Sequence, residues 1–180
     1  MAERFKAFSE AGPQLYLMQG NRDFLLGEGW CRKVGASLLA DPSVIDLYGT
    51  PTLLMHGDSL CTADAEYQAF RKQARDPAWQ ADLLSQALAE RRALAARLRA
   101  MSKDANSNKA EDIMDVTPSE VDAALAKAGV KRLIHGHTHR PARHEHSNGT
   151  RWVLGDWDET GWYIEASEDH FELIEFDLIQ

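Results

Sequence analysis

The sequence predicts an α/β domain in which buried strands alternate with helices, and polar loops follow the strands. Several apolar runs end at a polar, glycine-containing loop, and these runs are residues 14–18, 51–55, 130–134 and 151–154. Short apolar runs bounded by turn signals are typical of buried strands. Loops at the carboxyl ends of such strands gather at one edge of an open α/β sheet, where ligands bind. We therefore expect the functional residues in these loops.

The composition is that of one ordinary globular domain. The 180 residues are 44% hydrophobic and 27% charged, which suffices for one core and excludes a disordered, collagen-like or coiled-coil chain. No run of about 18 apolar residues occurs, so no membrane-spanning helix is expected. Residues 1–6 are charged and lead into no apolar run, so no signal peptide is expected either.

Charge and cysteine content identify no partner but favour a reducing compartment. Nine of the 28 acidic residues follow Arg151 and no Lys or Arg does, so the net charge of -8 belongs to the end of the chain. The remainder is almost neutral, and net charge therefore says little about partners. Cys31 and Cys61 are too few for a disulfide framework and lack the spacing of a zinc knuckle. Both are interpreted as small apolar core residues.

A long helical region is predicted after the second of these strands. No glycine lies between Gly57 and Gly129, and residues 65–101 contain eleven alanines with Pro77 as the only helix breaker. Apolar side chains recur at roughly helical spacing: Trp79, Leu83, Leu84, Ala87, Leu88, Leu94 and Leu98. A basic cluster accompanies them: Arg91, Arg92, Arg97, Arg99 and Lys103. This cluster fits an anionic surface or, equally, a solvated amphipathic helix docked on the domain.

A second, well-delimited helix is predicted before the third strand. Thr117 is a typical N-cap, Pro118 suits the first helical position, and Glu120 would complete a capping box with Thr117. The helix should run from Pro118 to Ala128, with Gly129 ending it.

Three imidazoles stand within five residues at the end of a predicted strand, namely His135, His137 and His139. Neutral imidazole binds divalent metals such as zinc, manganese or iron, and a strand-end loop directs alternate side chains to one site. The alternative is an accidental cluster or a tag, but tags lie at termini and this cluster lies between strand and turn signals. A metal site is therefore predicted here.

Two further strand ends add weaker signals that gain weight in combination. His56 alone is typical of a hydrogen-bonded packing residue, and Asn21, in a Gly-Asn turn, is a weaker signal still. With His137 and His139 they form a mixed nitrogen and oxygen set, which suits two adjacent ions better than one tetrahedral zinc. Metal ions about 3.5–4 Å apart activate water and hold a phosphoryl group, so phosphoester or diphosphate hydrolysis is predicted.

Three short motifs occur in a recognisable order: Gly-Asn-Arg-Asp at 20–23, His-Gly-Asp at 56–58 and Gly-His-Thr-His at 136–139. They resemble the later motifs of the calcineurin-like metallophosphoesterases. Longer matching segments are residues 20–27, 55–62, 113–116, 134–141 and 153–157. With these the chain resembles, over essentially its whole length, the UDP-2,3-diacylglucosamine hydrolases of lipid A biosynthesis. The resemblance implies a calcineurin-like α/β sandwich in which residues 65–110 form a helical insertion that caps the substrate.

The resemblance also implies the reaction and two manganese ions. A metal-activated water would attack the α-phosphorus of UDP-2,3-diacylglucosamine, releasing UMP and 2,3-diacylglucosamine 1-phosphate. On the family pattern Asn21, His56 and His137 bind one Mn2+ ion. His139 binds the other ion, and His135 is not a ligand.

Substrate contacts are implied for a larger set of residues: Asn21, Arg22, Asp64, Tyr67, Ser102, Asn106, Lys109 and His137. Of these, Arg22 and Lys109 suit the diphosphate charge, because both side chains are cationic. The last part of the helical region, residues 102–109, is polar and turn-prone. The acyl chains would lie against apolar residues of the insertion, for which the candidates are Trp79, Leu83, Leu84 and Leu88.

The resemblance implies a cytoplasmic protein, peripheral on the cytoplasmic face of the bacterial inner membrane. The basic cluster would contact anionic lipid there, at roughly 1 kcal/mol for each basic residue near the surface. No nucleic-acid partner is expected.

Two family motifs are absent from the sequence. Family members begin with a strand ending in Asp-x-His, and a second strand ending in Gly-Asp provides the carboxylate that bridges the metals. We therefore expect a sandwich that lacks its N-terminal strands and leaves His139 as the only ligand of its metal. Either the start is misassigned and the full protein is active, or the chain is an inactive remnant with a metal or nucleotide-lipid binding surface. A generic nucleotide phosphodiesterase is a further alternative, which predicts a basic groove with stacking aromatic residues.

Overall fold

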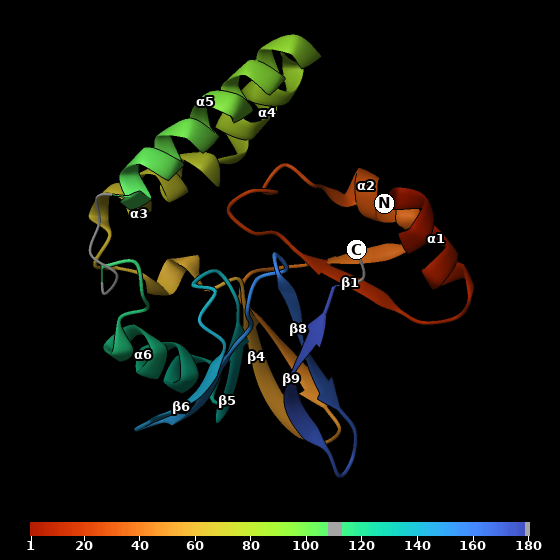
Figure 1. The fold of residues 1–180 in the computed structure, drawn as a ribbon, viewed down its shortest axis with the longest axis vertical. Coiled ribbons are helices and arrows are strands. Elements are labelled where there is room, and N and C mark those ends of the chain that lie inside the picture. The colour runs from red at the N-terminus through yellow and green to blue at the C-terminus, as the bar shows by residue number, and fades with distance from the viewer. Residues whose placement is uncertain (108–112, 179–180) are drawn as a thin grey trace.

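The computed structural model describes residues 1–107 and 113–178, the side chains of residues 102–107 excepted. Its centre is a five-stranded mixed sheet of order β3-β4-β5-β7-β6 (Figure 1). Its strands are β3 (Ser43–Leu47), β4 (Thr50–Met55), β5 (Arg132–His135), β6 (Ala142–His146) and β7 (Gly149–Val153). β4, β5 and β7 are parallel neighbours, whereas β3 and β6 pair antiparallel at the edges. Three of the predicted strands are thereby confirmed as β4, β5 and β7.

Two smaller sheets accompany the central one. β1 (Leu15–Met18) pairs in parallel with β2 (Ala36–Leu39), and β8 (Thr160–Ala166) forms an antiparallel hairpin with β9 (Phe171–Asp177). Within the described residues, neither pair is joined to a further strand. The prediction that β1 is buried and shares one sheet edge with the others is wrong, because β1 is only partly buried and lies in a separate sheet.

Two short helices lie beside the β1–β2 pair (Figure 1). They are α1 (Ala2–Glu10) and α2 (Glu28–Val34). Ser9 of α1 donates a hydrogen bond to the Val34 carbonyl at the end of α2, at 2.8 Å. Phe5 and Trp30 pack edge to face between the two helices, with ring centroids 5.9 Å apart.

α6 (Pro118–Ala128) closes the core against the central sheet. Val121 and Leu125 are fully buried and belong to the same cluster as Leu53 of β4 and Leu133 of β5. Each such side chain contributes on the order of 1.5–3 kcal/mol when it is fully buried. The bounds of this helix agree with the prediction, and Gly129 ends it in the left-handed region with φ at 67°.

The capping box predicted at the start of α6 is wrong. Thr117 makes no side-chain hydrogen bond to the helix. Its hydroxyl accepts a hydrogen bond from the Thr62 hydroxyl at 2.8 Å, and its N–H donates to the Leu60 carbonyl at 2.8 Å. Both bonds tie α6 to the segment after β4, so a tertiary contact has taken the place of the local cap.

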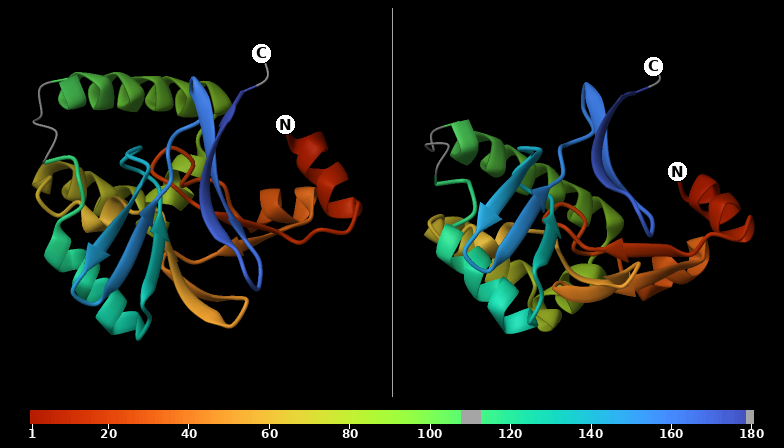
Figure 2. Two further views of the ribbon diagram at one scale, coloured as in Figure 1. Left: turned by 60° about the horizontal axis from the view of Figure 1, so that its bottom comes forward. Right: turned by 90° about the horizontal axis from the view of Figure 1, so that it is seen from below.

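The predicted helical region consists of a short 3-10 turn, η1 (Asp58–Leu60), and three α-helices. These are α3 (Ala65–Ala74), α4 (Pro77–Ser85) and α5 (Leu88–Ser107). α5 lies at the outside of the molecule, away from the central sheet (Figures 1 and 2). Of the candidate acyl-chain residues, Leu83 is buried in the core, whereas Leu84 and Leu88 are about half exposed, at 48% and 54%.

The turn predicted from residue 102 onward is wrong up to Ser107, because α5 continues to that residue. A nucleated alanine-rich helix adds one hydrogen bond for each further residue, and this outweighs the weak turn preference of Ser, Asp and Asn. Residues 108–112 lie outside the described part of the chain.

Cys31 and Cys61 are both buried and free, as expected of core residues. Among the helices that the structure describes, none is both long and apolar enough to cross a membrane.

Candidate active site

The parallel pairing of β4 with β5 brings two of the predicted ligands together. Met55 and His135 are register partners, so the residues that follow them leave the sheet side by side. The Gly136 N–H donates to the His56 carbonyl at 3.1 Å, which joins the two loops directly. As a result the imidazole rings of His56 and His137 pack edge to face, with centroids 4.9 Å apart.

The loop after β5 holds two histidines in an uncommon backbone conformation. His137 has φ at 65° and His139 has φ at 54°. A positive φ is uncommon for any residue other than glycine, and such residues cluster at functional sites. The Thr138 N–H donates to the Gly136 carbonyl at 2.8 Å, which closes this tight turn. Because of this turn, the imidazoles of His137 and His139 lie in different surroundings.

His56 is oriented by the loop after β1. The Asn21 N–H donates to Nε2 of His56 at 3.2 Å. Nε2 therefore carries the lone pair, and the proton of the neutral ring is on Nδ1. Burial lowers the pKa of His56, so the neutral form is favoured. The predicted ligands Asn21, His56 and His137 thus meet at one place, although β1 lies in a different sheet.

Two glycines allow this close packing. A Cβ atom on Gly20 would lie 2.9 Å from Cε1 of His56, too close for any side chain. Gly57 has φ at 110°, and a Cβ there would lie 2.6 Å from Nδ1 of His135. The glycines of the Gly-Asn and His-Gly-Asp motifs are therefore required by the approach of the imidazoles.

His137 is enclosed on a second side by α3. The Tyr67 ring packs against it, with centroids 5.5 Å apart. Burial lowers the pKa of His137 to about 4, with a smaller contribution from His56. Arg22, another predicted substrate contact, is exposed and near enough that its charge acts on His137 in the same direction. Neutral imidazole is the form that binds metal.

His135 differs from its two neighbours because both of its ring nitrogens are engaged within the protein. Nδ1 lies 2.8 Å from the Gly136 carbonyl, to which it donates, and Nε2 lies 3.3 Å from Nη1 of Arg151. Burial lowers its pKa to about 4. This is the environment of a packing histidine, in keeping with the expectation that His135 is not a ligand.

His139 lies on the open side of the loop. Its side chain is 48% exposed, and Nδ1 lies 3.5 Å from Oδ2 of Asp156. Asp156 was not among the predicted site residues. The signal that could have found it is its place in the Gly155-Asp156 loop that follows the predicted strand 151–154.

Asp64 and Tyr67, at the start of α3, both have partners within the protein. Asp64 caps the helix by accepting from the Tyr67 N–H at 3.0 Å. The Tyr67 hydroxyl donates to Oδ2 of Asp58 at 2.8 Å. Of the remaining predicted contacts, Ser102 and Asn106 lie in the last turns of α5, and Lys109 lies outside the described residues.

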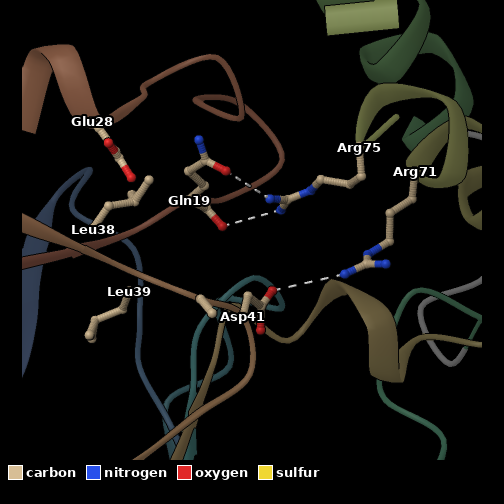
Figure 3. A pocket seen from close by; sticks show the side chains of 8 residues that line it. Gln19, Glu28, Leu38, Leu39, Asp41, Arg71 and Arg75 are labelled. Carbon is tan, nitrogen blue, oxygen red and sulfur yellow. Dashed lines mark hydrogen bonds and ion pairs between the residues drawn. The ribbon is translucent and has the colours of Figure 1, made fainter. Parts of the chain in front are cut away.

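A buried charge network below the histidines was missed by the sequence analysis. Asp58 is fully buried, and its carboxylate contacts Arg71 and Arg75 of α3. Burial alone would raise the pKa of Asp58, but the His56 imidazole and the Arg71 guanidinium outweigh burial and lower it. The two arginines also line a cavity of about 480 Å³ together with Gln19 and Asp41 (Figure 3). The signal available in the sequence was an arginine pair four residues apart, on one face of a predicted helix.

The kinds of donor atom at this place, imidazole nitrogen and amide oxygen, are ones that bind divalent ions such as manganese. Two neutral imidazoles pack together, and the backbone of Asn21, a residue with an amide oxygen in its side chain, contacts one of them. In the part of the chain that the structure describes, no three His, Cys, Asp or Glu side chains gather into one metal-binding group.

The mixed α/β fold, with histidines at neighbouring strand ends, is consistent with the metallophosphoesterase type. No protein-family model matches the chain. Among curated proteins, a UDP-2,3-diacylglucosamine hydrolase of Cellvibrio japonicus (strain Ueda107) is 54% identical over 182 residues, covering 99% of this chain and 76% of that relative. The chain therefore belongs to the UDP-2,3-diacylglucosamine hydrolase family.

Two further relatives carry the same name. That of Marinobacter nauticus (strain ATCC 700491 / DSM 11845 / VT8) is 54% identical, covering 94% of this chain and 71% of the relative. That of Hahella chejuensis (strain KCTC 2396) is 49% identical, covering 97% of this chain and 73% of the relative. The similarity thus extends over nearly the whole chain.

Proposed function

We propose that this protein hydrolyses the diphosphate of UDP-2,3-diacylglucosamine to UMP and 2,3-diacylglucosamine 1-phosphate, a step of lipid A biosynthesis. The family supports the substrate. The observation that carries the proposal is the meeting of Asn21, His56 and His137, in which both imidazoles are kept neutral beside the cationic Arg22.

The proposed cofactor is Mn2+, held by Asn21, His56 and His137, with His139 serving a second ion. When bound, such ions activate water and neutralise charge on the phosphoryl group. Burial of both rings opposes their protonation, so each imidazole is neutral. A metal ion at Nε2 of His56 would replace the hydrogen bond that this atom accepts from the Asn21 N–H. The neighbouring His135 does not compete for the ion, because both of its ring nitrogens already contact protein groups.

The substrate would lie between this site and the helices. Arg22 is proposed to hold the diphosphate, because its guanidinium is exposed and close to His137. Tyr67 covers His137 with its ring while its hydroxyl is held by Asp58, so the ring shields the imidazole from water. Asp64, Ser102, Asn106 and Lys109 are proposed as contacts to the sugar and nucleotide.

The acyl chains and the membrane are proposed to meet the outer helices. A hollow of about 810 Å³ on α5 is lined by Ala93, Leu94 and Arg97 among others, and Leu84 and Leu88 are exposed nearby in sequence. The arginines of the basic cluster would contact anionic lipid on the cytoplasmic face of the inner membrane, at roughly 1 kcal/mol each. Vesicles containing phosphatidylglycerol should retain the protein at low salt, and complete absence of binding would contradict this location.

Activity is tested by supplying Mn2+ and UDP-2,3-diacylglucosamine and measuring UMP release. Mn2+-dependent release, with little turnover of a generic phosphodiester such as bis-p-nitrophenyl phosphate, is the expected result. Comparable turnover of both compounds would instead favour a generic phosphodiesterase.

A second candidate function is binding without turnover. The observation in its favour is that, among the residues that the structure describes, His139 pairs with a single carboxylate, that of Asp156, on the open side of the loop. Retention of Mn2+ and the nucleotide lipid with no UMP release would establish this function in place of hydrolysis.

A further inference from the structure

We propose that Arg71 and Arg75 of α3 are positioning residues, which fix the loops carrying Asn21 and His56 relative to one another from beneath the site. That Asn21 and His56 bind metal rests on the proposed function. The positioning itself is a property of this chain in the absence of any metal.

Arg71 connects two buried carboxylates. Its Nε lies 3.1 Å from Oδ1 of Asp58, and its Nη2 lies 3.9 Å from Oδ2 of Asp41. Asp41 in turn accepts a hydrogen bond from the His56 N–H at 3.2 Å. Arg71 is therefore linked to His56 in two ways. Asp58, its first partner, follows His56 by two residues, and Asp41, its second partner, accepts the hydrogen bond from the His56 N–H.

Arg75, one turn further along α3, reaches the other loop. Its Nη2 donates to the Gln19 carbonyl at 3.2 Å, and Nη1 donates to the Gln19 side-chain oxygen at 3.5 Å (Figure 3). Gln19 lies two residues before Asn21. Nη2 also lies 3.7 Å from Oδ2 of Asp58. Arg75 thus joins the end of β1 to the end of β4, which belong to different sheets.

The contacts of Arg71 and Arg75 are important because the carboxylates that they pair with are buried. The Asp58 side chain is 0% exposed and the Asp41 side chain 7%, while the two arginines are mostly covered. Carboxylates in such positions need partners, because an unpaired buried charge is strongly unfavourable. The β1–β2 sheet shares no strand ladder with the central sheet in the described residues, so these side-chain contacts link the two parts of the site together with the Asn21–His56 hydrogen bond.

The network also connects the metal-binding loops to the proposed substrate contacts. Asp64 is the N-cap of α3 and Tyr67 lies in its first turn, while Arg71 lies in its last turn and Arg75 is its C-cap. The Tyr67 hydroxyl and both guanidinium groups converge on the single carboxylate of Asp58. A shift of α3 would therefore move the loops that bear Asn21 and His56.

The test uses the spectroscopic signature of the His56 ring in the metal-free protein. Because the Asn21 N–H donates to Nε2, long-range 1H–15N spectra should show His56 as a single tautomer with its proton on Nδ1. Arg71→Met and Arg75→Met should let the loops drift apart, and the His56 signals should broaden or show both tautomers. Arg71→Lys and Arg75→Lys keep the charge for Asp58 but not the fork, so they give a folded form of the same test if a methionine variant does not fold.

The matched control is Arg32→Lys in α2, whose partner is the exposed Glu28 at 3.2 Å. It should leave the His56 spectrum unchanged. An unaltered, single His56 tautomer in folded Arg71 and Arg75 variants would overturn the proposal.

Mn2+ titration separates this inference from the proposed function. If both hold, the folded Arg71 and Arg75 variants bind Mn2+ about 10–100-fold more weakly, which is the usual cost of losing an outer partner of a metal ligand. A parent protein that binds no Mn2+ contradicts the proposed function, while the tautomer spectra alone still decide the positioning role.

Discussion

His137 and His139 are two residues apart in one loop, yet their surroundings are opposite. His137 faces inward, where His56 and Tyr67 pack on it and burial lowers its pKa to about 4. His139 faces outward, half exposed, with Asp156 beside it. The difference shows that a ligand motif does not by itself make a site. The surroundings of His137 are built by the loops after β4 and β5 and by α3, whereas those of His139 consist of its own turn and the exposed Asp156.

Replacing His137 by alanine should have the largest effect. It removes one of two imidazoles from the inner position, so Mn2+ affinity and UMP release should fall by more than the roughly 100-fold that loss of an outer partner costs. Mn2+ titration and the UMP assay measure this. His170→Ala, at an exposed site beside Glu172, is the control and should change neither. Unchanged affinity in His137→Ala would remove this residue from the ligand set.

Gly20→Ala should have an intermediate effect. The added Cβ would lie 2.9 Å from Cε1 of His56, so the ring has to move from its place beside Asn21. We expect an affinity loss of about 10–100-fold, as for other disturbances of ligand orientation. Gly29→Ala in α2 is the matched control, because its Cβ would meet only the flexible end of Arg32 at 4.0 Å. Equal behaviour of the two variants would argue against close packing at His56.

His139→Ala should have a smaller effect than His137→Ala. Because His139 lies on the open side of the loop beside Asp156, its loss should change the Mn2+ affinity of the site at Asn21, His56 and His137 by less than about tenfold. This is below the range of about 10–100-fold for losing a hydrogen-bond partner of a metal ligand. The measurement is the same Mn2+ titration, performed on both variants in one series. A loss as large as that of His137→Ala would mean that the two histidines share one ion.

The pH dependence should be the smallest effect and concerns the metal-free protein. The pKa of His137 is lowered from 6.5 to about 4, so the folded state favours the neutral ring. Its contribution to stability is therefore present above pH 6.5 and is lost as the pH falls toward 4. The NMR signals of His137 should remain those of the neutral form down to this range. A titration midpoint near 6.5 would show that the inner position is open to water.

The sequence contains enough local information for the regular elements but not for the contacts between them. α6 was predicted to the residue, because Pro118 and Gly129 act locally at its two ends. The capping box of Thr117 was wrong, because Thr62, distant in sequence, captures its hydroxyl. The end of α5 was placed too early, because helix propagation outweighs the turn preference of single polar residues.

The candidate site shows the same division. Asn21, His56 and His137 were predicted from strand-end positions and motifs, and the structure brings them together. The network of Asp41, Asp58, Arg71 and Arg75 was missed, because each residue is unremarkable until the fold buries it. Asp156 was also missed, since only the turn after β5 brings His139 to it.

The central claim is that Asn21, His56 and His137 together hold a manganese ion. Anomalous scattering from crystals of the protein soaked in Mn2+ measures this most directly. We expect a strong manganese peak within bonding distance of His56 and His137, and no such peak in crystals of His137→Ala. Manganese absent from that place, or bound instead only between His139 and Asp156, would contradict it.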